Sequence, residues 1–339
     1  MRSRLVRVLA GVIFFAALAT IFIDFGFLKQ GRNLQTEEER EIRSEEPLHP
    51  MAIEALRKKN YEGSDIQIVE TLAPGTNYTR YIATYLSEGH KIFGLLTVPS
   101  MEKPENGFPI IAFLHGYIPP NQYRTTERYV AYQDSLARNG FITFKIDMRG
   151  HGQSEGEAEG AHFSETYVVD TLNAIASLKK FAGANPDKIG VWGHSNGGEI
   201  GLRSMVISTE IDAGVFWAGV VGSFEGMLET YNEKIPFLNL ERNKPEMINQ
   251  YGLPSENPEF WEQIDPYSYL TDINGAIQLH HGTADDSVPI ELSRQLKNAM
   301  ETEGKKAELY EYQGGDHNLS APSFGQAMER TVVFFRQHL

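Results

Sequence analysis

The stretch Ile189–Leu202, IGVWGHSNGGEIGL, constrains the fold of this chain more than any other. Gly193 to Gly197 match the pattern G-x-S-x-G, between an apolar run typical of a buried strand and a helical pattern. A serine on so sharp a turn has strained backbone angles, so the residues two before and two after it must be small. The Ser195 hydroxyl would stand at a helix N-terminus, where the dipole favours negative charge. The pattern alone leaves Ser195 open as a nucleophile or as a residue that only begins a helix.

Short apolar strands alternate with helices on both sides of this turn. Three β-rich runs between about residues 65 and 99 predict an antiparallel entry to a sheet. Helical patterns follow at residues 126–140, 165–182 and 323–339, and further strands are predicted at PIIAFL, FITFKID, IGVWGH, AGVFWAGVV, AIQLHH and AELYEYQ. The alternation predicts an α/β domain over residues 63–339, with a mostly parallel, twisted sheet covered by helices on both faces.

The segment 223–270 is longer than an ordinary connection between a strand and the next element. It contains helix-like pieces, proline and several aromatic residues. We expect a small helical lid over the carboxyl end of the sheet. A surface excursion with no role at the site is the alternative.

The first 30 residues predict a membrane segment. Three arginines precede the charge-free run Val8–Ile23, and the apolar pattern continues to about Leu28, close to the length that crosses a bilayer. An uncleaved signal anchor is favoured, with the rest of the chain outside the cytoplasm. The alternative is a signal peptide cleaved near Ala17–Ala19, which would give a secreted protein. Residues 31–62 are polar and acidic and predict a solvated stalk.

Composition excludes several other kinds of protein. Cysteine is absent, which removes disulfides, thiolate zinc sites and cysteine nucleophiles. A formal net charge of −14 argues against nucleic acid as a partner. Neither glycine-rich nucleotide-binding pattern occurs, so we expect no cofactor and no metal. These numbers do not indicate an oligomeric state.

A serine nucleophile needs a base, and ten histidines are candidates. His317 lies in a glycine-marked loop after the last predicted strand, where the order nucleophile, acid, histidine places the base. His115 and His281 end apolar strands and are expected to shape the site. His151 and His194 are interpreted as structural residues.

The orienting acid is expected in the loop LHHGTADDSVP, after the strand that precedes the histidine strand. Asp285 and Asp286 are both candidates, and spacing does not choose between them. Asp316 is adjacent to His317 in the chain, where a side chain is poorly placed for this contact.

An oxyanion site requires two backbone N–H donors. The residue after the serine, Asn196, supplies one. The loop HGYIPP follows the strand PIIAFL, and Gly116 would let its backbone approach a ligand. The amide of Tyr117 is therefore the predicted second donor.

These motifs together resemble the α/β-hydrolase superfamily and, more narrowly, the catalytic domain of the prolyl oligopeptidase family of serine peptidases. FLHGY, DMRGHGQSEG, GHSNGG, HGTADDSVP and GGDH occur in the family's order, from Phe113 to His317. The family motif H-G-x-x-D-x-x-V-P selects Asp285 over Asp286. The resemblance also implies Ser195 as nucleophile, His317 as base, and the Tyr117 and Asn196 amides as oxyanion donors.

The resemblance implies hydrolysis of an ester or amide bond through an acyl-enzyme intermediate, on a small ester or a short peptide. Many family members carry a β-propeller, and the residues before this sheet are too few for one. A prolyl-oligopeptidase-like peptidase is favoured. The HGY loop is also similar to that of acetyl esterases, so a carboxylesterase is the alternative, and a non-catalytic binding protein of the same fold is a third hypothesis.

Overall fold

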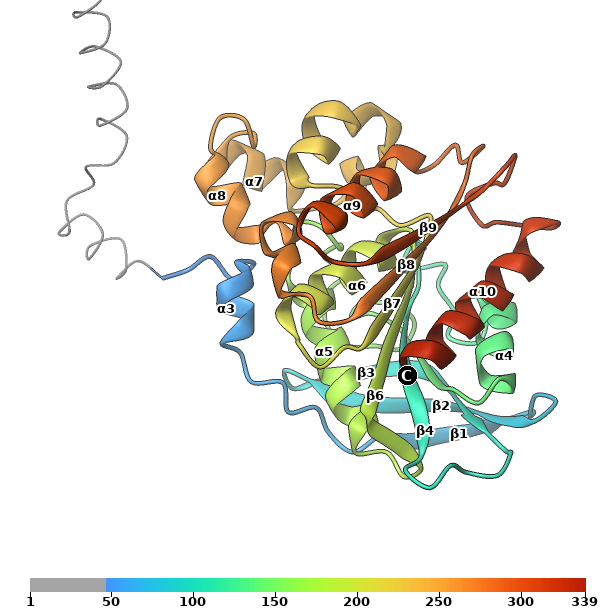
Figure 1. Ribbon diagram of the computed structural model, residues 1–339. Helices are drawn as coiled ribbons and strands as arrows, with labels where there is room; N and C mark the ends of the chain where they lie inside the picture. Colours follow the sequence, from blue (N-terminus) through green and yellow to red (C-terminus); the bar gives the residue numbers. More distant parts are fainter. Residues whose placement is uncertain (1–46) are drawn as a thin grey trace, which may run out of the picture. The chain divides into compact units, whose positions relative to one another are not determined.

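A computed structural model describes residues 47–339, and the compact unit within them runs from Pro50 to Leu339. Figure 1 shows its sheet and the helices around it. The strands are β1 (Gln67–Leu72), β2 (Tyr78–Ser87), β3 (His90–Pro99), β4 (Phe108–Leu114), β5 (Ile142–Ile146), β6 (Ala184–His194), β7 (Ala213–Trp217), β8 (Ala276–Gly282) and β9 (Ala307–Tyr312). The α-helices are α3 (Ile53–Arg57), α4 (Val130–Arg138), α5 (Thr166–Lys179), α6 (Asn196–Ile207), α7 (Lys244–Tyr251), α8 (Pro258–Ile264), α9 (Ile290–Thr302) and α10 (Ser323–His338).

The strands of the described domain form one nine-stranded sheet in the order β1-β2-β3-β5-β4-β6-β7-β8-β9. β1, β2 and β3 pair antiparallel, and β3 also pairs antiparallel with β5. From β5 to β9 every neighbouring pair is parallel. The predicted antiparallel entry and mostly parallel sheet are confirmed.

Helices cover both faces of this sheet, as predicted. Figure 1 shows α5 and α6 on one side of the strands and α4 and α10 on the other. β5 and β7 are buried at every position. The sequence of β7, AGVFW, is accordingly a continuous apolar run, whereas β5, ITFKI, alternates and buries the polar residues Thr143 and Lys145. Leu136 of α4 packs with Phe334 and Phe335 of α10, while Ile200 of α6 lies in the larger core on the opposite face.

The compact domain begins earlier than the sequence predicts. Residues 31–62 were expected to form a polar stalk, but α3 lies inside that range and belongs to the compact unit. Ile53 and Leu56 are fully buried in the main core, and α3 packs on α6. The two apolar residues face the same side of one helical turn, and five residues are too short for periodicity to reveal. The predicted anchor, 1–30, lies outside the described residues, as do residues 31–46 of the stalk.

The helix predicted over residues 126–140 begins only at Val130. Arg128 and Tyr129 adopt positive φ angles of 52° and 53°, which a right-handed helix excludes. Gly140, at φ 93°, ends the helix as expected. The late start changes the position of Tyr129, which would otherwise lie on the helix surface.

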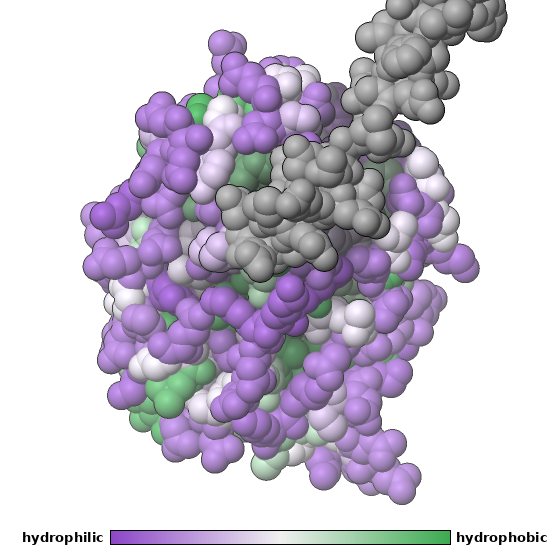
Figure 2. All heavy atoms as spheres, turned by 90° about the vertical axis from the view of Figure 1, so that its left-hand side faces the viewer, coloured by the Kyte–Doolittle hydropathy of each residue, from purple (hydrophilic) through white to green (hydrophobic). Residues whose placement is uncertain are grey.

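The segment 223–270 is helical in short pieces, as predicted. It contains the turns Gly226–Thr230, Asn232–Lys234 and Pro236–Leu240, then α7 and α8, and the kinked turn Pro266–Asp272. Its apolar side chains, which include Phe224 and Trp261, lie in a hydrophobic core separate from the main core. On the face shown in Figure 2, hydrophilic side chains predominate, and the apolar groups between them are small. Between residues 47 and 339, the structure has no helix long and apolar enough to cross a membrane.

Candidate active site

Ser195 stands on a strained turn between β6 and α6. Its backbone angles are φ 56° and ψ −119°, and the residue is 4% exposed. A Cβ on Gly193 would lie 2.3 Å from the carbonyl oxygen of Gly197, and a Cβ on Gly197 would lie 2.1 Å from that of Leu114. Both glycines of the pattern are therefore required by backbone packing, and Ser195 faces the end of the sheet with α6 beginning directly behind it.

His317 and Asp285, which lie in different loops, form a hydrogen-bonded pair. Nδ1 of His317 is 2.8 Å from Oδ2 of Asp285. A carboxylate only accepts, so Nδ1 carries a proton, and in the neutral imidazole Nε2 then keeps a free lone pair. His317 and Ser195 line one cavity of about 390 Å³. The lone pair that a general base needs is thus in the same cavity as the serine hydroxyl.

Asp285 is fixed by four donors. Its Oδ1 accepts the backbone N–H groups of Ser287 and Val288, each at 2.9 Å. Its Oδ2 accepts His317 and also His281 Nε2, at 3.1 Å. Burial by itself raises the pKa of Asp285, but the hydrogen bonds from His281 and His317 outweigh it and hold the pKa well below its ordinary range. The carboxylate is therefore ionised and can stabilise a protonated His317.

His281 supports Asp285 from a fully buried position. Its Nε2 also lies 3.0 Å from the carbonyl oxygen of Val288, which only accepts, so Nε2 carries the proton. Nδ1 then accepts the Ser293 hydroxyl at 2.7 Å. The expectation that His281 shapes the site agrees with this arrangement. Asp286 is exposed, and its carboxylate accepts a hydrogen bond from the Ser287 hydroxyl rather than from a histidine.

The two loops that carry the predicted acid and the predicted base touch through their backbones. A Cβ on Gly282 would lie 2.1 Å from the carbonyl oxygen of Gly315. Gly314, at φ 69°, donates its N–H to the Thr283 hydroxyl at 2.9 Å. Glycine at these positions lets the loops approach closely enough for Asp285 to reach His317.

The predicted oxyanion donors lie where two cavities meet. Tyr117 lines the cavity of Ser195 and also a smaller one of about 120 Å³, which Asn196 lines too. Asn196 is the first residue of α6, so its N–H has no acceptor within the helix. A Cβ on Gly116 would lie 3.0 Å from the Ser195 Cβ. The loop after β4 therefore passes directly over the serine, as an oxyanion loop must.

Sequence reasoning missed Tyr129, whose phenol lies at the centre of a hydrogen-bond chain. Its oxygen accepts the N–H of Gly116 at 2.9 Å and lies 2.8 Å from His194 Nδ1. His194 Nε2 lies 3.0 Å from the carbonyl oxygen of His317, so Nε2 is the protonated nitrogen and Nδ1 accepts the Tyr129 proton. Burial, and next the charge of His317, lower the pKa of His194 to about 3, so its ring is neutral.

These hydrogen bonds connect the loop that carries Tyr117 to the loop that carries His317. They run from the Gly116 amide through Tyr129 and His194 to the His317 carbonyl. His194 is thus structural, as interpreted, but it acts between the two loops of the site. No motif marks Tyr129, because its inward direction depends on the positive φ angles at the start of α4.

Buried Lys145 supports the same turn. Its ammonium donates to the carbonyl oxygens of Glu127, at 2.8 Å, and of Arg128, at 3.4 Å. Burial lowers the pKa of Lys145 to about 8, although the charge of Asp147 opposes this shift. Two successive residues with positive φ cost about 1–3 kcal/mol each. The lysine contacts offset part of that strain.

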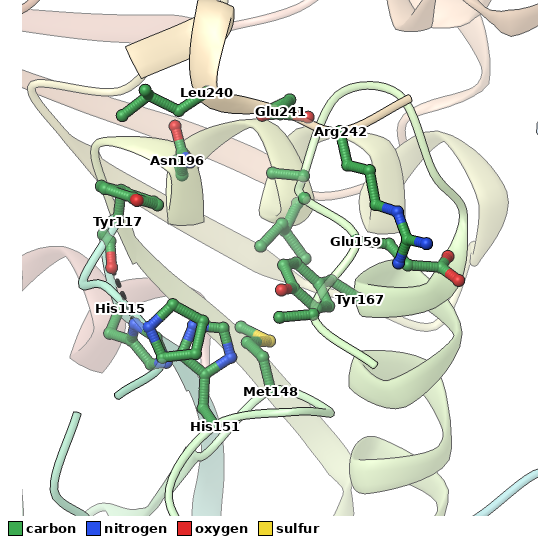
Figure 3. Close-up of a pocket in the computed structure, with 16 residues that line it drawn as sticks. His115, Tyr117, Met148, His151, Glu159, Tyr167, Asn196, Leu240, Glu241 and Arg242 are labelled. Carbon is green, nitrogen blue, oxygen red and sulfur yellow. Dashed lines mark hydrogen bonds between the residues drawn. The ribbon is translucent and has the colours of Figure 1, made fainter. Parts of the chain in front are cut away.

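Segment 223–270 lines one side of the smaller cavity. Figure 3 shows Leu240, Glu241 and Arg242 across the cavity from His115 and His151. Glu241 accepts hydrogen bonds from the backbone N–H groups of His162 and Phe163, at 3.0 and 3.2 Å, and from His162 Nδ1 at 2.7 Å. Burial raises the pKa of Glu241, but His162 outweighs burial and lowers it overall. An ionised carboxylate thus attaches segment 223–270 to the loop before α5.

Close packing at Gly160 makes this attachment specific. Gly160 has φ 108°, and a Cβ there would lie 2.5 Å from Oε2 of Glu241. His115 lines the cavity, which agrees with the expectation that it shapes the site, and its Nδ1 donates to the Gly116 carbonyl at 2.7 Å. His151, interpreted from sequence as structural, lines the same cavity.

Proteins with similar sequences include two that are described as peptidases. The chain is 26% identical to the uncharacterized peptidase YtmA of Bacillus subtilis over 72% of this chain and 88% of that protein. It is 24% identical to the uncharacterized peptidase YuxL of the same organism, over 74% of this chain but only 38% of YuxL. The length covered therefore differs widely between these relatives.

Solved structures with the same fold include esterases and peptidases. An acetyl xylan esterase from Paenibacillus sp. R4 superposes with a TM-score of 0.64 at 18% identity, over 85% of this chain and 92% of the esterase. The acylaminoacyl peptidase of Pyrococcus horikoshii has a TM-score of 0.62 at 21% identity, over 78% of this chain and 42% of the peptidase. At these identities the likeness shows the fold.

The family model of the prolyl oligopeptidase family matches residues 128–339, well over half of the chain. This range contains the Ser195 turn, the Asp285 loop and the His317 loop. The chain is therefore a serine hydrolase of the α/β-hydrolase fold, and it belongs to the prolyl oligopeptidase family.

Proposed function

We propose that this serine hydrolase is a peptidase that cleaves short peptides, with Ser195 as nucleophile, His317 as base and Asp285 as the orienting acid. One observation carries the proposal. His317 donates Nδ1–H to an ionised Asp285 and keeps its other nitrogen free, in the cavity that Ser195 lines. That is the tautomer a general base needs.

The reaction follows from these positions. His317 Nε2 takes the Ser195 proton as Oγ attacks the carbonyl carbon, and the developing oxyanion is held by the Tyr117 and Asn196 amides. His317 then gives the proton to the leaving nitrogen as the C–N bond breaks. Water, deprotonated by the same histidine, attacks the acyl-enzyme and releases the acid. Asp285 stabilises the imidazolium in both halves of the reaction.

Two observations support short peptides as the substrate. The relatives that match along this chain are described as peptidases, including one of which the chain covers 88%. The cavity beside Asn196 holds only about 120 Å³, which limits the group on the acyl side of the bond. The lid residues Leu240 to Arg242 line this cavity, which supports a role for segment 223–270 as a lid.

A carboxylesterase is the second candidate. Acetyl xylan esterases from Paenibacillus sp. R4 and Thermoanaerobacterium sp. have the same fold and are covered along 92% and 94% of their own lengths. Turnover of p-nitrophenyl acyl esters and of short peptide amides by the purified protein distinguishes the two. Peptide cleavage supports the peptidase. Ester cleavage without peptide cleavage supports the esterase, and turnover of neither contradicts both.

We also propose that residues 1–30 anchor the enzyme in a membrane, with the hydrolase domain outside the cytoplasm. The proposal rests on the arginines that precede the charge-free run Val8–Ile23. Residues 31–46 would form the polar linker to the domain. Protease added to intact cells should digest the domain and leave cytoplasmic proteins intact. A protected domain that becomes accessible only after lysis would contradict the proposed orientation, and full release by carbonate extraction would contradict the anchor.

A further inference from the structure

The cavity that contains His317 is the leaving-group side of the site. In the proposed reaction His317 passes a proton to the leaving nitrogen, so the leaving group must lie against this residue. His317 lines the cavity of about 390 Å³ and does not line the smaller cavity beside Asn196. The residues that surround His317 in the larger cavity therefore meet the part of the substrate that departs.

Arg128 gives this cavity a positive charge. It is the one Asp, Glu, Lys or Arg among the described residues that line the cavity, and its side chain is exposed. His194, in the same lining, is neutral because burial lowers its pKa. No ion pair joins Arg128 to another residue of the range 47–339. In a chain with a formal net charge of −14, the charged side chain that lines the cavity of Ser195 is thus a positive one.

The backbone holds Arg128 at this cavity rather than leaving it on a free surface. Arg128 and Tyr129 are the two strained residues before α4, and the buried ammonium of Lys145 binds the carbonyl oxygens of Glu127 and Arg128. Tyr129 points inward to Gly116 and His194, so the turn is fixed on both sides. Strain maintained in this way is typical of functional positions.

We propose that Arg128 binds a carboxylate on the leaving-group side of the substrate, so that the enzyme prefers peptides whose scissile bond lies close to a free C-terminus. The guanidinium forms paired hydrogen bonds with a carboxylate and stays charged at any working pH. This inference rests on the proposed function. In the step itself, the C–N bond breaks, the proton from Ser195 goes through His317 to the nitrogen, and the released amine carries the carboxylate away with it.

Matched substrates test the proposal. Each is a short N-acylated peptide, made once with a free C-terminal carboxylate and once as the C-terminal carboxamide. The full chain should cleave the carboxylate form with a kcat/KM about tenfold higher, mainly through a lower KM. Salt at high concentration should shrink this preference, because an exposed ion pair is screened.

Arg128→Gln should abolish the preference, so that its kcat/KM for the carboxylate form falls to the value for the carboxamide. Labelling of the variant by a fluorophosphonate shows that it folds. Arg138→Gln is the matched control, because Arg138 is exposed, lies on α4 and is absent from the cavity lining. It should keep the preference. Equal kcat/KM values for both substrates in the wild type, or a preference that survives Arg128→Gln, would overturn the inference. A wild-type protein that cleaves neither substrate and takes no fluorophosphonate label would instead contradict the proposed function.

Discussion

Tyr129 donates its phenolic proton to Nδ1 of His194 over 2.8 Å, and its oxygen accepts the N–H of Gly116 over 2.9 Å. The second nitrogen of His194 holds the backbone carbonyl of His317. One phenol therefore fixes the distance between the loop of the predicted oxyanion donor Tyr117 and the loop of the predicted base.

Tyr129→Phe should lower kcat about tenfold and change KM little. The substitution leaves the Gly116 N–H and His194 Nδ1 without partners, at a cost of about 1–3 kcal/mol for a buried polar group, and it frees the oxyanion loop to shift. Steady-state kinetics measures the effect. Tyr78→Phe is the control, because its hydroxyl donates to Asp134 at 3.0 Å and lies in neither site cavity. Equal losses of activity in both variants would mean that the hydrogen bonds of Tyr129 have no special role in catalysis.

Asp285→Asn should lower kcat by about 10⁴, whereas Asp286→Asn should stay within about twofold of wild type. An amide at position 285 cannot accept Nδ1–H in the same way and turns His317 toward the wrong tautomer. Asp286 is exposed. Its carboxylate accepts a hydrogen bond from the Ser287 hydroxyl and does not orient a histidine. Kinetics on the same substrate compares the pair, and comparable rates for the two variants would remove Asp285 from the proposed mechanism.

Glu241→Gln should destabilise the protein by about 1–3 kcal/mol and raise KM for the hydrolysed substrate. Its carboxylate accepts three hydrogen bonds from His162 and Phe163, and an amide nitrogen in place of one oxygen faces a donor instead. The wall of the smaller cavity then loosens. Urea unfolding and steady-state kinetics measure the two effects. Glu246→Gln, at an exposed position on α7, should change neither. An unaltered KM in Glu241→Gln would show that this wall does not bind substrate.

His280 should make the domain less stable as the pH falls. Burial, and next the charge of Arg330, lower its pKa from the ordinary 6.5 to about 3. The unfolded chain binds a proton below pH 6.5 and the folded chain only near pH 3, so the free energy of unfolding falls as the pH falls between those values. The loss is about 1.4 kcal/mol per pH unit.

A variant without this group isolates the effect from other titrating residues. The stability difference between wild type and His280→Gln should fall by about 1.4 kcal/mol per pH unit from pH 6 to pH 4. Urea unfolding at several pH values measures it. Parallel stability curves for the two proteins would contradict a neutral, buried His280.

The turn at Ser195 shows why much of the site could be predicted from the sequence. Gly193 and Gly197 are required because a Cβ at either would collide with the backbone. The sequence pattern is therefore determined by local packing. The same holds for Gly282, which lets the acid loop meet the base loop. Alternating strand and helix patterns predicted the sheet for a similar reason, since burial on both faces demands continuous apolar strands.

Tyr129 and α3 show where such prediction ends. Tyr129 contacts His194 across 65 positions of sequence, and it does so only because two residues adopt positive φ angles that their side chains do not favour. The five-residue α3 lies in a mostly polar stretch of sequence. Ile53 and Leu56 can be recognised as core residues only when the core against which they pack is known. Both features depend on tertiary contacts that no local pattern carries.

The role of Ser195 as the nucleophile is tested most directly by the reaction of the purified protein with a fluorophosphonate, followed by mass spectrometry of its peptides. We predict one adduct, on Ser195, which is lost together with hydrolytic activity in Ser195→Ala and forms much more slowly in His317→Ala. A wild-type protein that takes no label and hydrolyses no substrate, or a Ser195→Ala variant that keeps its activity, would contradict Ser195 as the nucleophile.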